Sequence, residues 1–489
     1  MSEQAKKLSL MTFVGITMAL CANVRSVPTL AAAGWQLVAY LLFAIIFVAL
    51  PLAAMCGELS SMLPGEGGLQ LWVSTGLNDK WGFMTSWIVW AQLFPGMVLP
   101  ACTLGPLLGN SFGNNALGTN HWFIFGCIIV FYWILTILNL KFDMAKFGGK
   151  IGVWLGVYLP CIMLLAMGSA AALKVGINPA GYLGTFSWQA LIPNLKDVQA
   201  MHYLAGIVFI FVGIEMSSVY VPQMAEPAKY VKGVFISVLG LIAINLLNGL
   251  LVANIVPKGT MELTNITQPI RIECQILGLP EILANIFAFM VFLGVLLQLS
   301  AWVTGPMKTM IQCSRQGLVP KSLGYYKVNK YGVSRNVVLT QSIGISLFAC
   351  LYAVLDDVNG VFMILTNATT IVYCFVYVLI ALAFVKLRYD QPTAARAYKL
   401  GGKGNGNFLA WLAAALVILG IGFAAFTVVY TSTFLDNCIV IAICALLLIV
   451  PLLIYAHKKP EWIPSPDEYY ESEEARETFI GKPGLSQKN

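Results

Sequence analysis

Long apolar runs alternate with short polar segments along the whole chain. Most runs hold about 20 residues, the length that a helix needs to cross a bilayer. The runs are continuous, whereas the strands of a membrane β-barrel alternate between apolar and polar positions. We therefore predict an all-α membrane protein with twelve transmembrane helices, at approximately residues 9–33, 35–62, 82–111, 121–140, 150–174, 199–223, 232–256, 281–312, 336–355, 359–385, 408–431 and 436–456.

Two of the predicted spans contain a charge near mid-depth, beside residues that interrupt helices. The first span contains Asn23-Val-Arg-Ser-Val-Pro28, with Arg25 inside it. The sixth span contains Glu215, with Gly213 before it and two serines after it. A charge at the centre of a membrane helix costs at least ~2.5–3.5 kcal/mol, so such a residue marks a candidate functional site. We predict that both spans are broken at these residues.

The two interruptions occupy corresponding positions in two blocks of the chain. Each lies in the first span of a five-span block, and an odd number of spans places the two blocks in opposite orientations. Paired interrupted helices in inverted repeats point to the binding site of a transporter. Unwound backbone in a membrane must line a cavity, where its free N–H groups favour an anion and its free C=O groups a cation. The pattern indicates a zwitterionic ligand such as an α-amino acid.

Arg25 and Glu215 are expected to compensate each other. An isolated buried charge is costly, so a coupled pair is the economical arrangement for two charges at mid-depth. The alternative is a purely structural one, in which two kinked helices are joined by this ion pair. Both interpretations predict contact between the two side chains.

The spans divide the chain into three parts. These are residues 1–8, a cytoplasmic N-terminal segment, residues 9–457, the transmembrane domain, and residues 458–489, an acidic cytoplasmic tail. Within the domain, repeat 1 covers 9–174, repeat 2 covers 199–385, and 408–456 hold two additional helices. We interpret the tail as solvated and largely disordered; the alternative is a cover over the cytoplasmic mouth, attracted to basic loops.

The basic residues are distributed unevenly between the two sides of the membrane. With the N-terminus inside, 24 of the 29 Lys and Arg residues fall on the inner side, and only Lys174, Lys196, Lys258 and Arg271 fall outside. Because basic residues accumulate on the cytoplasmic side, we predict a multi-pass protein of the cell membrane with both termini in the cytoplasm. The net charge of +7 then reflects membrane orientation, and no nucleic-acid partner is expected.

Composition narrows the class further. Hydrophobic residues make up 58% of the chain and charged residues only 10%, against about a quarter charged in soluble domains. Most of the 11 cysteines lie in or beside apolar runs, so we interpret them as buried apolar residues and expect no metal or cofactor. The sequence shows no HExxH motif, no catalytically spaced Ser/His or Asp/Asp pair and no repeated pore loop, which argues against an enzyme and against a channel.

Four motifs are similar to those of a known superfamily. They are the stretch from Leu8 to Trp35, PGEGGLQLWV at residues 64–73, VGIE at 212–215 and AWVTGPMKTM at 301–310. Over roughly residues 8–456, the chain resembles the amino acid–polyamine–organocation superfamily, and within it the glutamate:GABA antiporter family and its relatives that exchange an amino acid for its decarboxylated amine. The resemblance implies the leucine-transporter fold, a five-plus-five inverted repeat, with two additional helices.

The resemblance also implies a substrate site between spans 1, 3, 6, 8 and 10. Carried over to this sequence, the substrate-binding residues are Asn23, Val24, Arg25, Ser26 and Val27 in the first span, Phe209, Gly213, Ile214 and Glu215 in the sixth, and Trp302 in the eighth. Phe209 matches a gating aromatic and Trp302 a cavity-lining tryptophan. From spacing alone, packing or lipid contact explains these two aromatic residues better.

The implied activity is secondary-active antiport by alternating access, in which an external amino acid is exchanged for its decarboxylated amine. Tyrosine/tyramine, histidine/histamine and glutamate/GABA are the candidate pairs. Where the glutamate:GABA type carries aromatic and acidic residues before the span-one proline, this chain has Val24 to Val27, and it has Gln298 in place of an acid. These departures favour the first two pairs.

The same interpretation predicts the partners of the protein. They are a small amino acid and an amine, the lipid bilayer, and a functional link to a cytosolic decarboxylase, whose proton consumption would serve acid resistance at the inner membrane. The protein is expected as a monomer or a homodimer. The alternative function is a proton-coupled amino acid importer of the same superfamily, and an exchanger differs from it by stalling without internal substrate.

Overall fold

The computed structural model describes residues 8–21, 24–63, 68–142, 151–152, 154–194, 201–211, 213–215, 217, 220, 224–304, 306–402 and 406–480. Their regular structure is helical, with isolated β-bridges and no strand within this part of the chain. The α-helices before residue 200 are α1 (Leu10–Cys21), α2 (Val27–Ala32), α3 (Leu37–Ala44), α4 (Leu50–Met62), α5 (Gly68–Gly76), α6 (Asp79–Ala91), α7 (Leu93–Cys102), α8 (Leu104–Ser111), α9 (His121–Lys141) and α11 (Leu159–Val175). Those after residue 200 are α13 (Leu204–Phe209), α14 (Tyr230–Ile255), α15 (Thr267–Leu277), α16 (Ile282–Thr304), α17 (Met307–Arg315), α18 (Arg335–Ala349), α19 (Leu351–Val354), α20 (Val358–Asp390), α21 (Gly406–Thr431), α22 (Phe434–Ala456) and α23 (Glu473–Ile480).

Ten helical segments of the described chain are long and apolar enough to cross a membrane. They are Gly34–Met62, Asp79–Ser111, His121–Lys141, Trp154–Val175, Tyr230–Ile255, Ile282–Ser300, Arg335–Val354, Val358–Asp390, Gly406–Thr431 and Phe434–Ala456. Each overlaps one predicted span, so the helices are confirmed over ten of the twelve predicted ranges. The other two ranges, 9–33 and 199–223, are those for which the sequence predicted a break.

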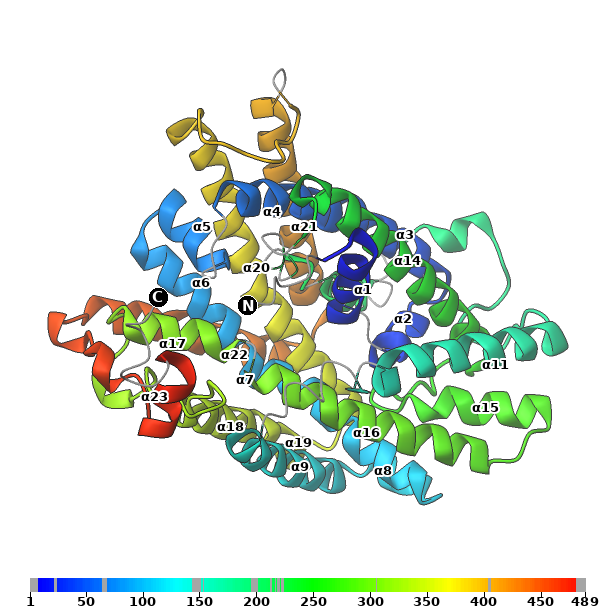
Figure 1. The fold of residues 1–489 in the computed structure, drawn as a ribbon. Helices are drawn as coiled ribbons and strands as arrows, with labels where there is room; N and C mark the ends of the chain where they lie inside the picture. The colour runs from blue at the N-terminus through cyan, green and yellow to red at the C-terminus, as the bar shows by residue number, and fades with distance from the viewer. Residues whose placement is uncertain are drawn as a thin grey trace.

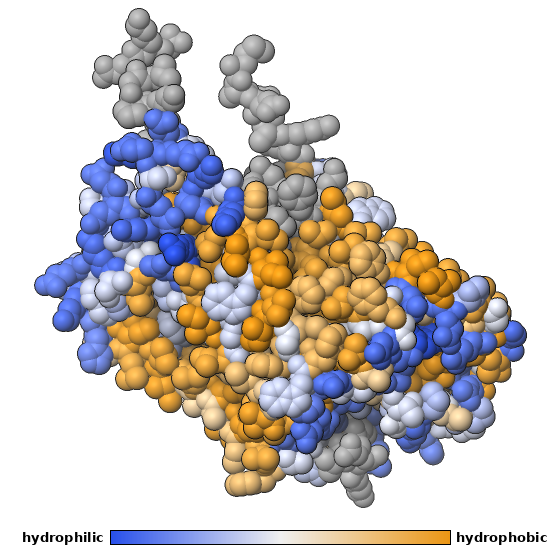
Figure 2. All heavy atoms as spheres, turned by 90° about the horizontal axis from the view of Figure 1, so that it is seen from below, coloured by the Kyte–Doolittle hydropathy of each residue, from blue (hydrophilic) through white to orange (hydrophobic). Residues whose placement is uncertain are grey.

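The surface agrees with a protein embedded in lipid. Figure 2 shows hydrophobic residues covering the middle of one face, with hydrophilic residues gathered toward the upper left and the lower right. Large apolar side chains lie exposed on helices at the periphery, among them Trp122 and Ile134 of α9 and Ile441 and Leu453 of α22. In water such a surface would be unstable, whereas lipid tails solvate it at no cost.

The centre of the bundle is built around α20 and the bent segment α6–α8. In Figure 1, α20 runs diagonally through the middle of the molecule, and it packs against α5, α7, α13, α21 and α22. Protein buries 72% of the most apolar part of α20 and 89% of the most apolar part of α6–α8, but only 28% of that part of α22. The first two elements therefore lie in the interior and α22 lies at the lipid boundary.

A cluster of buried charges lies at the C-terminal end of α20. Glu58 on α4 is 1% exposed and forms ion pairs with the Arg388 guanidinium and with Arg396 Nε, the latter at 3.0 Å. The Leu400 backbone N–H also donates to Glu58, at 2.9 Å. Helix α20 continues beyond the predicted span to Asp390, so that Arg388 on its last turns reaches the cluster. The cluster ties α4 to α20 and to the segment that follows α20.

The described part of the C-terminal tail is folded onto the rest of the chain. Lys321 Nζ lies 2.7 Å from Glu468 and Lys330 Nζ lies 3.0 Å from Glu474. The guanidinium of Arg315 stands 4.4 Å from the centre of the Tyr469 ring. Up to residue 480, the expectation of a largely disordered tail was wrong, because backbone pairing and ion pairs hold the tail against the segment after α17, while most of its residues remain exposed to solvent. We call the end of the bundle that carries this contact the tail face.

The pKa values of two carboxyl groups in the tail are shifted in opposite directions. The Lys321 ammonium holds the pKa of Glu468 below its ordinary value of 4.5, so this ion pair is present at neutral pH and is lost as pH falls through the lowered pKa. Burial raises the pKa of Glu471, so docking gains from its protonation and loses that gain as pH rises through the raised pKa. Glu471 is therefore protonated first on acidification.

Deleting residues 458–489 is expected to change the pH dependence of transport in the acidic range without abolishing transport. The reason is that the protonation of Glu468 and Glu471 changes how firmly the tail is docked, and the tail contacts the segment between α17 and α18. The measurement is the initial rate of transport in proteoliposomes as a function of pH, for the full-length and the truncated protein. Coincident pH profiles would show that the docked tail has no influence on transport.

Candidate functional site

The first predicted break lies where the sequence placed it. Helix α1 ends at Cys21, residues Val24–Ser26 form a short 3₁₀ segment, and α2 begins at Val27. Pro28 is tolerated because it stands at the start of α2, where a missing backbone N–H breaks no helical hydrogen bond. Asn23, one of the predicted binding residues, lies outside the described residues.

The second predicted break follows α13. This helix ends at Phe209, and Gly213 adopts φ +107°, a conformation that favours glycine. The described positions from 210 to 215 are turn residues, with Glu215 in a 3₁₀ conformation, and hold no regular α-helix. Sequence-local chemistry thus determines both breaks, one through proline and one through glycine.

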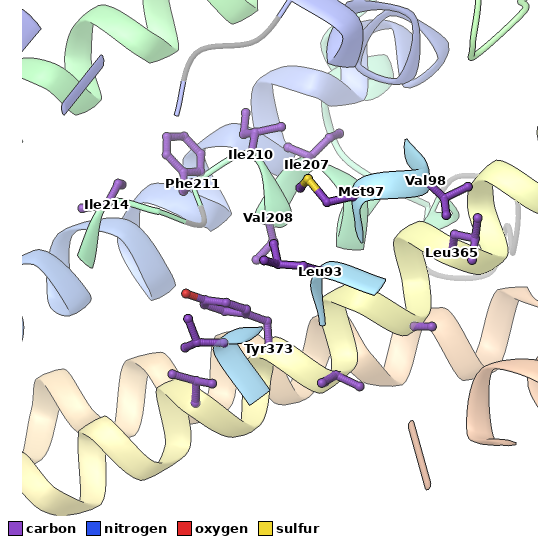
Figure 3. Close-up of a cluster of buried hydrophobic side chains, with 14 of the residues drawn as sticks. Leu93, Met97, Val98, Ile207, Val208, Ile210, Phe211, Ile214, Leu365 and Tyr373 are labelled. Atoms are coloured by element: carbon purple, nitrogen blue, oxygen red, sulfur yellow. The ribbon is translucent and has the colours of Figure 1, made fainter. Parts of the chain in front are cut away.

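Glu215 is fully buried, and its carboxylate is held by three donors. Tyr373 donates to Oε1 at 2.5 Å and Tyr377 donates to Oε2 at 3.0 Å. The Gly213 backbone N–H donates to the same carboxylate, at 3.1 Å to Oε2. The two tyrosines are four residues apart on α20, so they lie on the same face of that helix. Figure 3 shows Tyr373 on α20 below the segment that carries Ile210, Phe211 and Ile214.

Arg25 has a different partner from the one that the sequence predicted. Its Nη1 donates to Oε1 of Gln298 at 2.8 Å, which links the first break to α16. The predicted contact with Glu215 was wrong, since neither carboxylate oxygen of Glu215 lies within ion-pair distance of Arg25. The site therefore holds two separate charged groups, each bound by neutral partners.

The two broken segments lie side by side. Helix α2 packs against α13, and a Cβ on Gly206 of α13 would lie 3.4 Å from the Thr29 methyl group. The hydroxyl of Thr29 is buried, and none of the described residues forms a hydrogen bond with it. A buried, unpaired hydroxyl beside two unwound segments is available to a ligand, since leaving it unpaired is costly.

The remaining predicted site residues fall into two groups. Val24, Val27 and Ile214 are buried in the hydrophobic core, so their side chains serve packing and only their backbone is suited to ligand contact. Arg25, Ser26, Phe209 and Trp302 are each only partly buried. Trp302 follows Gln298 by four residues and so shares its face of α16.

Sequence reasoning missed Tyr373, Tyr377 and Thr29, and it noted Gln298 without pairing it with Arg25. The spacing of the tyrosines, four residues apart in an otherwise apolar span, was the available signal, because it places two hydroxyls on one helix face. No sequence signal could assign them to Glu215, which is 158 residues from Tyr373.

The fold and the site define a polytopic α-helical membrane transporter with two interrupted segments at its centre. The amino acid permease family matches residues 8–450, so this chain belongs to that family, within the amino acid–polyamine–organocation superfamily. It is a transporter and not an enzyme.

Curated relatives agree with this assignment. The chain is 26% identical to an uncharacterized transporter of Legionella pneumophila over 481 residues, covering 96% of this chain and 100% of that protein. It is 26% identical to a glutamate/gamma-aminobutyrate antiporter of Lactococcus lactis over 427 residues, covering 86% and 82%. It is 22% identical to a probable agmatine/putrescine antiporter of Lactococcus lactis over 411 residues, covering 82% and 84%.

Proposed function

We propose that this protein is a secondary-active antiporter that exchanges an external amino acid for its decarboxylated amine by alternating access. The observation that carries the proposal is the pairing of α2 with α13, each beside an interruption that holds a charged residue, Arg25 in one and the buried Glu215 in the other. Freed backbone groups and charges inside a membrane protein suit a zwitterion. The names of the glutamate/gamma-aminobutyrate and agmatine/putrescine antiporters support exchange as the mode of transport.

The proposed architecture has twelve spans, with the two interrupted segments as spans one and six of a five-plus-five inverted repeat. The tail face is proposed as the cytoplasmic side, because it carries the basic segment from Arg315 to Arg335 and basic residues accumulate on the cytoplasmic side. Repeat 1 would cover residues 9–174 and repeat 2 residues 199–385. The two helices in 408–456 would complete the domain at the lipid boundary.

In the proposed site, the break from Asn23 to Pro28 binds the carboxylate pole of the ligand. Arg25 and the Thr29 hydroxyl supply donors there, and backbone carbonyls at the end of α13 face the ammonium pole. Glu215 holds the unwound turn of span six through Gly213 and ties it to α20. Phe209 and Trp302 are proposed to cover the ligand, where their ring faces suit a cationic group.

The proposed exchange converts decarboxylation into acid removal and membrane potential. Decarboxylation by a cytosolic enzyme consumes a proton and removes one negative charge from the precursor. The product that leaves is thus one unit more positive than the precursor that enters, and one charge moved outward is worth ~2.3 kcal/mol per 100 mV. A functional link to such a decarboxylase is part of the proposal, and the protein would work as a monomer or a homodimer.

Counterflow in proteoliposomes tests the exchange. Uptake of labelled amino acid is expected to need preloading with the corresponding amine and to stall in empty vesicles. An imposed pH gradient should not replace the internal amine. If uptake into empty vesicles is driven by a pH gradient alone, the protein is the alternative, a proton-coupled importer of the same superfamily.

A further inference from the structure

Helix α15 connects helices of the two proposed repeats at one end of the molecule. It is not among the ten membrane-spanning segments, and it packs against α8 and α11 of repeat 1 and against α14 and α16 of repeat 2. Arg271 on α15 donates to the side-chain oxygen of Asn110 on α8 at 2.9 Å. Figure 1 shows α15 on the opposite side of the molecule from α23 and the tail face. A change in how α15 is held therefore changes contacts between the repeats.

Glu273 lies on the buried face of α15. Its side chain is fully buried, and neither carboxyl oxygen forms a hydrogen bond with any described residue. A Cβ on Gly168 of α11 would lie 3.0 Å from Oε1 of Glu273 and 3.1 Å from the Cβ of Leu251 on α14. The carboxyl group thus occupies a junction of α11, α14 and α15. An ionised carboxylate without a partner in such a place is very costly, whereas the protonated acid is much less so.

Within the described chain, the helices around α15 offer no positive charge to Glu273. Helices α8 and α16 contain no titratable residue. Lys174 at the end of α11 and Lys232 at the far end of α14 are exposed to solvent. Arg271 is two positions from Glu273, on another face of α15, and binds Asn110. The other titratable groups on these helices are thiols and a phenol, which carry no positive charge: Cys161, Cys274 and Tyr230.

We propose that Glu273 is a proton-binding site that makes the docking of α15 depend on pH at the outer side of the membrane. With its proton bound, the side chain is neutral and stays in the junction of α11, α14 and α15. Loss of the proton places an unpaired charge there, which is relieved when α15 moves away and water reaches the carboxylate. The proposal goes beyond the proposed exchange and does not depend on the substrate. The outer placement follows from the proposed orientation.

The pH range of the site follows from the difference in proton affinity between the docked and the solvated carboxyl group. Burial raises the pKa of Glu273 from its ordinary value of 4.5 to about 9. The docked state therefore keeps a proton that the solvated state has lost. The stabilisation is fully present below pH 4.5 and is lost as pH rises through about 9. Glu273 thus favours docking of α15 under acidic and neutral conditions and opposes it under alkaline conditions.

Glu273→Gln tests the site, because it replaces the protonated acid with a neutral amide of similar shape. The variant is expected to melt close to the wild-type protein at pH 5 and several degrees above it at pH 9, where only the wild-type protein is strained by ionisation. The measurement is the apparent melting temperature of the full-length protein in detergent from pH 5 to pH 9. Glu281→Gln is the matched control, since Glu281 is exposed just after α15, and it should keep the wild-type pH profile.

Two outcomes of this comparison would overturn the proposal. The first is a difference in melting temperature between Glu273→Gln and the wild-type protein that does not change with pH. The second is a Glu273→Gln protein that is less stable than the wild-type protein at pH 9, because that result would show an ionised carboxylate paired with a cation.

Hydrogen–deuterium exchange of the wild-type protein tests the site if Glu273→Gln does not fold. After correction for the intrinsic pH dependence of exchange, the protection of α15 should fall about tenfold for each pH unit between about 5 and 9, since each opening releases one proton. Helix α9, which does not contact α15 closely, should keep its protection over the same range. Protection of α15 that stays constant across this range would contradict a proton-dependent docking.

Discussion

Replacing Glu58 with glutamine is expected to produce one of the largest losses of stability that a single substitution can cause in this protein. Glu58 is the carboxylate that two buried guanidinium groups share, those of Arg388 and Arg396, whose side chains are 2% and 3% exposed. Removing one partner of a buried ion pair costs roughly 3–5 kcal/mol, because the remaining charge stays buried without compensation. Here two like charges would remain, so we expect the upper part of this range.

The measurement is the apparent melting temperature in detergent, followed by size-exclusion chromatography of heated samples. Glu226→Gln is the matched control, since Glu226 is a 62%-exposed carboxylate paired with Lys229 and its loss should cost less than about 1 kcal/mol. Arg396→Gln should destabilise less than Glu58→Gln, because Glu58 keeps Arg388. If Glu58→Gln melts together with Glu226→Gln, the cluster contributes nothing to stability.

Glu215→Gln is expected to reduce both stability and transport strongly. The carboxylate accepts from Tyr373, Tyr377 and the Gly213 backbone N–H, and hydrogen bonds to a charged group contribute ~1.5–3 kcal/mol each at buried sites. A glutamine amide would turn an N–H₂ group toward one of these donors. The unwound turn of span six would lose its attachment to α20, so substrate exchange in proteoliposomes should fall with the melting temperature.

Double-mutant cycles would measure which residues interact energetically with Glu215. Glu215→Gln combined with Tyr373→Phe should be non-additive, with an interaction energy of about 0.5–3 kcal/mol, because the two side chains share a hydrogen bond. Glu215→Gln combined with Arg25→Met should be additive within about 0.5 kcal/mol, because Arg25 contacts Gln298 instead. Strong coupling of Arg25 with Glu215 would restore the ion pair that the sequence suggested.

The sequence by itself determined the membrane class, ten of the helices and the places where two spans are broken. These features are local. In lipid, the backbone N–H and C=O groups of a run of about 20 apolar residues must form hydrogen bonds within a helix, whatever that helix packs against. A proline or a glycine restricts or frees the backbone at its own position, so Pro28 and Gly213 could be identified before any contact was known.

Only the tertiary structure decided which groups the buried charges meet. Arg25 and Gln298 are 273 residues apart, Glu215 and Tyr373 are 158 apart, and Glu58 and Arg388 are 330 apart. The high cost of an isolated buried charge suggested that Arg25 and Glu215 form an ion pair, but that argument considers only the charges and not where packing places them. The packing of α16 and α20 against the broken segments brings a neutral amide and two phenols closer to these charges than they are to each other, and a hydrogen bond forms only with the group that packing places within reach.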